Sequence, residues 1–158
     1  MMEEDEIVTD SVVAEDIPME VDDQVELMKV TMNGETFLVP VHDVAEILRP
    51  LELTPVPMAP DHLLGVTNIR GQIVCIVDPG KVLHLESERG ALTDDSRFLI
   101  LRHPRMHLGI WVDETSVLYR VNKSLVPEVQ KDSHTHHRGD MEIDGETFQV
   151  LNTEIFFG

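Results

Sequence analysis

The chain has 158 residues and carries 12 Lys and Arg against 30 Asp and Glu, which gives a formal net charge of -18 at pH 7. This charge argues against binding to nucleic acid and to anionic membrane surfaces, because both need a positive surface on the protein. The length suits one domain, or two small subdomains that share a core, and no apolar run approaches the roughly 20 residues that cross a bilayer.

The N-terminal segment, residues 1–26, holds 11 of the 30 acidic residues and no Lys or Arg. It is predicted to be a disordered acidic tail, followed by one folded domain over residues 27–158. The tail is either plain solvated chain or an electrostatic arm for a basic partner. Its acidic start does not resemble an export signal, and the single Cys75 agrees with a reducing compartment, so we expect a cytoplasmic protein.

The first folded elements are predicted to be a hairpin and a short helix. Residues 26–32 and 35–40 are strand-like and flank Asn33-Gly34, a pair that readily takes the positive φ angles of a type I′ turn. Residues 41–48, VHDVAEIL, place apolar side chains at helical spacing and predict a short amphipathic helix that ends at the following proline.

The next segment contains the most informative pattern in the chain. Prolines limit residues 50–60 to an irregular edge strand, and DHLLG predicts a helical turn capped by Gly65. Two strands joined at Arg70-Gly71 follow. The second includes IVCIV, residues 73–77, whose unbroken apolar run predicts a strand buried on both faces.

The second half of the chain begins with a short helix opened by Asp78-Pro79 and a polar connector, residues 86–96, which divides the folded part near its middle. Three strands are then expected to form a meander, followed by a long polar loop. Asp144-Gly145 predicts a last hairpin, and a short terminal helix completes a fold of about nine or ten strands.

Candidate catalytic and metal-binding groups are few. HTHH, with His134, His136 and His137, lacks the spacing of a closed structural site and favours adventitious metal binding or plain solvation. His103 and His107 flank a proline turn, where helical ligand geometry does not apply. Cys75 lies inside the apolar run and is expected to be an inert core thiol. We expect no cofactor and no enzyme activity, and a metal-binding or small-molecule-binding β-barrel stays open as an alternative.

Arg70 is the strongest candidate for a partner contact. It lies at a tight turn, where Gly71 supplies the backbone freedom and the guanidinium points outward. Such an arginine is often only solvated. On a rigid hairpin it is also a good binding hot spot, because little conformational entropy is lost when it pairs with a carboxylate.

The stretch GVTNIRGQIVCIVD, residues 65–78, resembles the CheW family of chemotaxis coupling proteins, whose motif there is close to GVxNLRGxIxPIVDL. Cys75 stands where the family commonly has proline. The similarity extends over roughly residues 27–157. It implies a mainly β fold of two intertwined five-stranded SH3-like barrels with short helices, and the connector at 86–96 is the expected subdomain boundary.

The resemblance also implies a function without chemistry. Family members are scaffolds that bridge the cytoplasmic tip of chemoreceptors and the regulatory domain of a CheA-type histidine kinase, in receptor arrays at the inner membrane. CheW-like adaptors also serve pilus and gliding pathways. The family's receptor-facing positions and the residues that shape the same hairpin fall here on Val44, Glu46, Gly65, Asn68, Ile69, Arg70 and Gly71.

Overall fold

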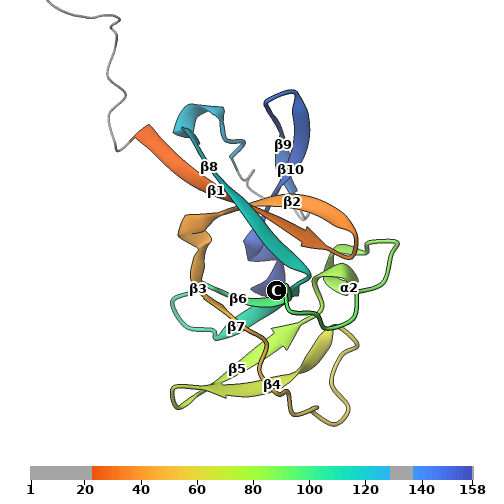
Figure 1. Ribbon diagram of the computed structural model, residues 1–158. Coiled ribbons are helices and arrows are strands. Elements are labelled where there is room, and N and C mark those ends of the chain that lie inside the picture. Colours follow the sequence, from red (N-terminus) through yellow and green to blue (C-terminus); the bar gives the residue numbers. More distant parts are fainter. Residues whose placement is uncertain (1–22, 129–136, 158) are drawn as a thin grey trace, which may run out of the picture.

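The computed structural model describes residues 23–128 and 137–157, and it contains two five-stranded sheets, one above the other in Figure 1. We call them the terminal sheet and the middle sheet, after the parts of the chain that form them. The terminal sheet has the order β8-β1-β2-β10-β9 and the middle sheet the order β3-β6-β7-β5-β4. The predicted mainly β class with two five-stranded units is confirmed, and closure of each sheet into a barrel stays a prediction.

The elements of both sheets are short. The terminal sheet contains β1 (Gln24–Met32), β2 (Glu35–Pro40), β8 (Glu114–Asn122), β9 (His137–Ile143) and β10 (Glu146–Leu151). The middle sheet contains β3 (Val44–Leu48), β4 (Leu63–Ile69), β5 (Gln72–Val77), β6 (Arg97–Leu101) and β7 (Leu108–Val112). Four short helices accompany them: η2 (Val41–Asp43), α2 (Pro79–Leu83), η3 (Lys123–Leu125) and η4 (Thr153–Phe157).

The three predicted hairpin turns are all present. Each has two consecutive residues with positive φ, which is the type I′ geometry that matches the twist of the flanking strands. The φ angles are 54° and 80° at the first turn, 51° and 86° at the second, and 53° and 83° at the third, for Asn33-Gly34, Arg70-Gly71 and Asp144-Gly145 respectively. The predicted helix after β5 is also confirmed, since the Asp78 side chain caps α2 by accepting from the backbone N–H of Gly80.

Two predicted helical segments are strands instead. Residues 41–48 form only the single turn of η2 before β3 begins, and β3 pairs with β6. Leu63 opens β4, where a helical turn was predicted, and pairs with Val77 of β5. Both segments are too short for helical propensity to outweigh the backbone pairing that the neighbouring strands offer.

The second group of strands differs from the predicted meander. β6 and β7 pair antiparallel, but β8 leaves the middle sheet and pairs with β1. Asp113, the single residue between β7 and β8, carries the chain from one sheet to the other. The middle sheet is therefore an insertion between β2 and β8, and the chain changes sheet at η2 and at Asp113.

The predicted two-faced burial of residues 73–77 holds only for part of the run. Val74, Ile76 and Val77 are buried, Cys75 is half-buried, and Ile73 is 59% exposed. The strand thus extends beyond the core at its hairpin end.

A shared apolar core holds the two sheets together. Met28, Val30 and Phe37 of the terminal sheet pack in one buried cluster with side chains of β5, β6 and β7. Two smaller buried clusters lie on the face of each sheet opposite the shared core, around Phe148 in the terminal sheet and around Phe98 in the middle sheet. At about 1.5–3 kcal/mol for each buried Val, Leu, Ile or Phe side chain, this core is the main source of stability.

The polar connector at residues 86–96 is anchored to this core. Asn33, only 4% exposed, donates from its side chain to the Ser87 carbonyl oxygen at 2.8 Å, and Arg89 lies over the Trp111 ring at 4.5 Å. The strands before and after the connector belong to the same sheet. The subdomain boundary near 86–96, and the division into a tail 1–26 and a domain 27–158, stay predictions; β1 begins at Gln24, and residues 1–22 lie outside the described part.

Within residues 23–128 and 137–157, no helix is long and apolar enough to span a bilayer.

Replacing Gly109 of β7 by Ala tests how tightly the shared core is packed. The added methyl group would lie 2.7 Å from Cδ1 of Ile100 and 3.1 Å from the Leu99 carbonyl oxygen, so we expect a loss of about 1–3 kcal/mol in the free energy of unfolding. Gly90→Ala is the control: the glycine is exposed and has no positive φ, and its added methyl group would meet only the end of the Asp113 side chain, at 3.3 Å, so it should cost less stability than Gly109→Ala. Equal urea midpoints for the two variants would contradict the prediction.

Candidate functional site

The predicted site residues lie on the two edge strands of the middle sheet. Val44 and Glu46 belong to β3, and the remaining residues belong to β4 or to the turn that follows it: Gly65, Asn68, Ile69, Arg70 and Gly71. β3 and β4 stand at opposite ends of the strand order. The site therefore joins segments that are distant both in the sequence and in the sheet.

A bidentate ion pair connects the two edges. The guanidinium of Arg70 donates from Nη1 to Oε1 of Glu46 at 2.7 Å and from Nη2 to Oε2. Two parallel N–H to O bonds fix the relative orientation of both side chains, which a single contact would not do. Sequence reasoning named both residues but did not foresee that they pair.

The turn geometry explains why Arg70 can reach Glu46. Arg70 and Gly71 have φ angles of 51° and 86°, and the side chain of Asn68 accepts from the backbone N–H of Gly71 at 2.9 Å. This hydrogen bond closes the turn from within. Arg70 thus starts from a rigid base, and little further ordering is needed for its side chain to hold a carboxylate.

The pair lies at the surface. The Arg70 side chain is 73% exposed and that of Glu46 26% exposed. Hydrogen bonding to the Arg70 guanidinium lowers the pKa of Glu46, and the same bonds raise the pKa of Arg70. Because solvent screens exposed charges, the pair contributes orientation to the site more than stability to the fold.

Two of the predicted site residues are buried and influence the course of the backbone. Val44 belongs to the shared core. Gly65 is buried with a φ of 154°, and a Cβ there would lie 2.9 Å from the Thr54 carbonyl oxygen, so any side chain would force this segment away from β4. Both residues shape the site, while Glu46, Asn68 and Arg70 present polar groups outward.

Two exposed apolar side chains near these residues were not predicted as part of the site. Ile73 is 59% exposed and lies opposite Asn68 in the hairpin, whereas Ile47, 46% exposed, follows Glu46 on β3 and so points to the opposite face of that strand. A large exposed apolar group on the same hairpin as a charged pair is typical of protein contact surfaces. The alternation of β5 would have indicated Ile73, because it points to the face opposite Val74.

The described residues show no group of three or more His, Cys, Asp or Glu side chains arranged for a metal ion. His103 accepts through Nδ1 from the backbone N–H groups of Arg105 and Met106 and stacks on Phe157, so it has a local structural role. His134 and His136 lie outside the described residues, as does the side chain of His137.

Comparison with known protein families shows to which family this chain belongs. A family model described as a CheW-like domain matches residues 26–157. The chain belongs to the CheW-like family. All seven predicted site residues lie inside the matched range.

Individual CheW-like proteins are similar over part of their length. The chemotaxis protein CheW of Helicobacter pylori is 27% identical over 106 residues, which are 65% of this chain and 63% of that protein. The chain thus spans a little under two thirds of that relative. Protein PilI of Pseudomonas aeruginosa is 31% identical over 83 residues, 52% of this chain and 46% of PilI.

A solved structure shows the same fold. The scaffolding protein TtCheW from Thermoanaerobacter tengcongensis superposes with a TM-score of 0.72 at 19% identity, over 91% of this chain and 92% of that chain.

The titration of Glu46 tests the ion pair directly. Because its pKa is lowered in the folded state, the pair contributes stability above the ordinary glutamate pKa, and this contribution is lost as the pH falls through the lowered value. Arg70→Gln should move the pKa of Glu46 up toward the ordinary value in a side-chain NMR titration, and high salt should move it in the same direction. Arg120→Gln, which removes a separate exposed pair with Glu26, should leave Glu46 unchanged. An identical midpoint in wild type and Arg70→Gln would rule out the pair.

Proposed function

We propose that this chain is a non-catalytic scaffold that couples chemoreceptors to a CheA-type histidine kinase. Its proposed partners are the cytoplasmic tip of the receptors and the regulatory domain of the kinase, and its proposed location is the cytoplasm, in receptor arrays at the inner membrane. The observation that carries the proposal is the rigid Arg70–Glu46 pair on the exposed edges of the middle sheet, in a chain of the CheW-like family. The names of similar proteins, a chemotaxis protein and a scaffolding protein, support the same assignment.

The surface around the pair suits reversible protein binding. Arg70 offers donors in a fixed planar arrangement, Asn68 and Gly71 hold the turn beneath it, and Ile73 supplies exposed apolar area on the same hairpin. A partner carboxylate can share or replace Glu46 on the guanidinium without a change in the backbone. The specificity of the contact then comes from geometry and charge, and its affinity comes from burial of the apolar area.

Charge reversal at Arg70 tests the proposal. Arg70→Glu places two carboxylates against each other, so we expect at least a tenfold weaker affinity for a receptor cytoplasmic fragment, or about 1.4 kcal/mol. The fold should remain, since the residue lies at an exposed turn. Calorimetric titration measures the affinity, and the thermal unfolding midpoint checks the fold.

Two further variants make this test specific. Arg120→Glu changes the charge equally at another exposed ion pair, on the terminal sheet, and should bind the receptor fragment as wild type does. The double variant Glu46→Arg with Arg70→Glu restores an ion pair with the two charges exchanged. It should recover the local order around the pair, but it should not recover the affinity for the native partner. The assignment fails if Arg70→Glu binds both the receptor fragment and the kinase regulatory domain with unchanged affinity.

A second candidate function is the same scaffold role in a non-flagellar chemosensory pathway, such as one that controls pili or gliding. The similarity to protein PilI supports this second candidate. Affinity capture of the full chain from its native cytoplasm distinguishes the two pathways by the receptor and kinase that copurify. A kinase whose deletion abolishes swimming bias supports the first, and one whose deletion affects only surface motility supports the second.

A further inference from the structure

The chain passes between the two sheets at only two points in the described region, and each point has an aspartate. At Asp113 the backbone N–H donates to the Thr31 carbonyl oxygen, and the side chain accepts from the Asn33 N–H at 2.9 Å. At η2, residues Val41–Asp43, the chain leaves β2 and enters β3. The course of η2 therefore decides where β3, the strand that contains Glu46, begins.

Apolar packing holds only the start of η2, where the half-buried Val41 packs against the shared core. None of its residues is buried. A cavity of about 530 Å³ borders Asp43 on one side, and a second of about 810 Å³ is lined by Pro40 and all three residues of η2. Asp43, the last residue of η2, borders both cavities and lacks close packing on those sides, so the position of this end of η2 depends on polar contacts.

Those polar contacts come from residues far along the chain. Arg102 donates from Nε to the His42 carbonyl oxygen at 2.9 Å and from Nη2 to the Val44 carbonyl oxygen at 3.3 Å, and its backbone N–H donates to the Asp43 carbonyl oxygen at 2.8 Å. Arg102 follows β6, so these bonds tie η2 to the middle sheet. These bonds hold the backbone at Asp43 and at the residues on either side of it.

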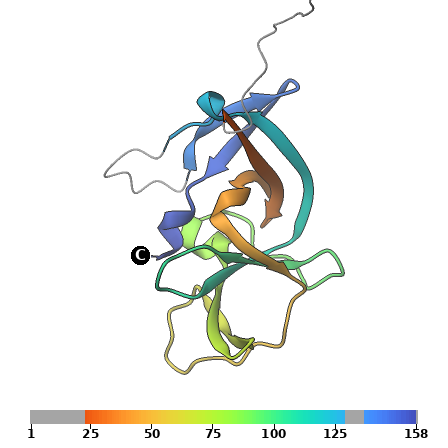
Figure 2. The same cartoon turned by 90° about the vertical axis from the view of Figure 1, so that its left-hand side faces the viewer.

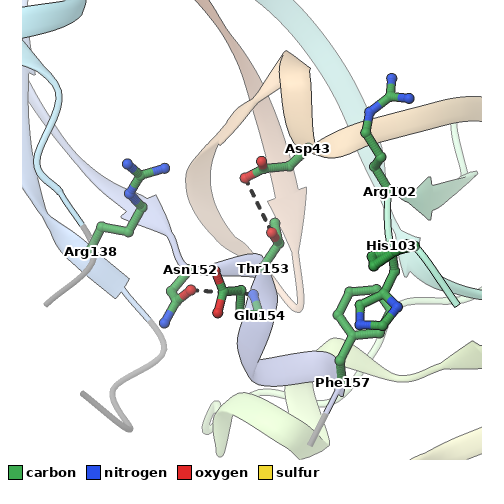
Figure 3. Close-up of a pocket in the computed structure, with 9 residues that line it drawn as sticks. Asp43, Arg102, His103, Arg138, Asn152, Thr153, Glu154 and Phe157 are labelled. Atoms are coloured by element: carbon green, nitrogen blue, oxygen red, sulfur yellow. Dashed lines mark hydrogen bonds between the residues drawn. The ribbon is translucent and has the colours of Figure 1, made fainter. Parts of the chain in front are cut away.

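The contact on the other side comes from the terminal sheet. The hydroxyl of Thr153, the first residue of η4 and two residues after the end of β10, donates to Oδ2 of Asp43 at 3.2 Å. Figure 3 shows Asp43 and Thr153 facing each other, with Arg102 and His103 beyond them on one side of the pocket and Arg138 on the other. Asp43 is thus held from both sides: Arg102, next to the middle sheet, bonds its backbone, and Thr153, next to the terminal sheet, bonds its carboxylate.

We infer that Asp43 is a positioning residue for the partner site: the Thr153 bond to its carboxylate sets the entry of β3 into the middle sheet and so places Glu46 for Arg70. Glu46 lies three residues after Asp43, and the register between β3 and β6 shifts between Val44 and Glu46. A change in the course of η2 would therefore reach Glu46 through the irregular first part of β3. The effect on partner binding rests on the proposed function, whereas the effect on β3 does not.

Thr153→Val tests the inference, because it removes the hydroxyl and keeps the shape of the side chain. We expect amide hydrogen exchange to accelerate roughly tenfold in β3 and much less in β1 and β10, and the Glu46 carboxyl to titrate nearer its ordinary range. Thr153→Ser keeps the hydroxyl and should restore wild-type exchange. Thr147→Val, at an exposed threonine of β10, is the matched control and should leave β3 unchanged.

Two results would overturn the inference. Unchanged exchange in β3 of Thr153→Val would show that the Asp43 bond does not position the strand. Equal acceleration in both sheets would show a general loss of stability in place of a local effect.

Receptor binding then separates this inference from the proposed function. Weaker binding by both Arg70→Glu and Thr153→Val supports both. If Arg70→Glu weakens binding and Thr153→Val, with a loosened β3, does not, the positioning role fails and the proposed function stands. If neither variant weakens binding, the proposed function fails, and the exchange data alone decide whether Asp43 positions β3.

Discussion

The apolar core between the two sheets is the constraint on which the rest of the molecule depends. Met28, Val30 and Phe37 from one sheet and Leu99 and Ile110 from the other belong to a single buried cluster. Neither sheet can keep this surface from water without the other, so the protein is one cooperative unit built from two layers (Figure 2). The edge strands of the middle sheet contribute to this core through Val44 and Leu63, while Arg70, at the hairpin turn, stays outside it.

The topology determines which edges become the site. The strand order of the middle sheet places its first two strands in the sequence, β3 and β4, at its two edges. The Arg70–Glu46 pair links these edges outside the core, and the contacts of Asp43 set the point at which β3 enters. The site is therefore assembled by tertiary structure on a frame that hydrophobic packing stabilises. Its exposed charges can exchange partners without loss of that frame.

The residues of the site divide into those that shape it and those that can touch a partner. Val44 is packed in the core and Gly65 allows the close approach of Thr54, so substitution at either changes the backbone. Arg70 presents an unburied guanidinium, and the apolar Ile73 lies near it on the same hairpin. The proposed scaffold role would need this division, because a contact surface must keep its geometry in the absence of any partner.

The sequence by itself determined the turns, the first turn of α2 and the chemistry of the hairpin around Arg70. These features are local: Asn33-Gly34, Arg70-Gly71 and Asp144-Gly145 take positive φ angles that few other residue pairs tolerate, and Asp78 caps the helix that follows it. Only the tertiary structure decided that residues 44–48 form a strand, that β8 joins the terminal sheet, and that Arg70 pairs with Glu46. The reason is that a short segment has weak propensity of its own, so its state is set by pairing with strands whose positions depend on the whole chain.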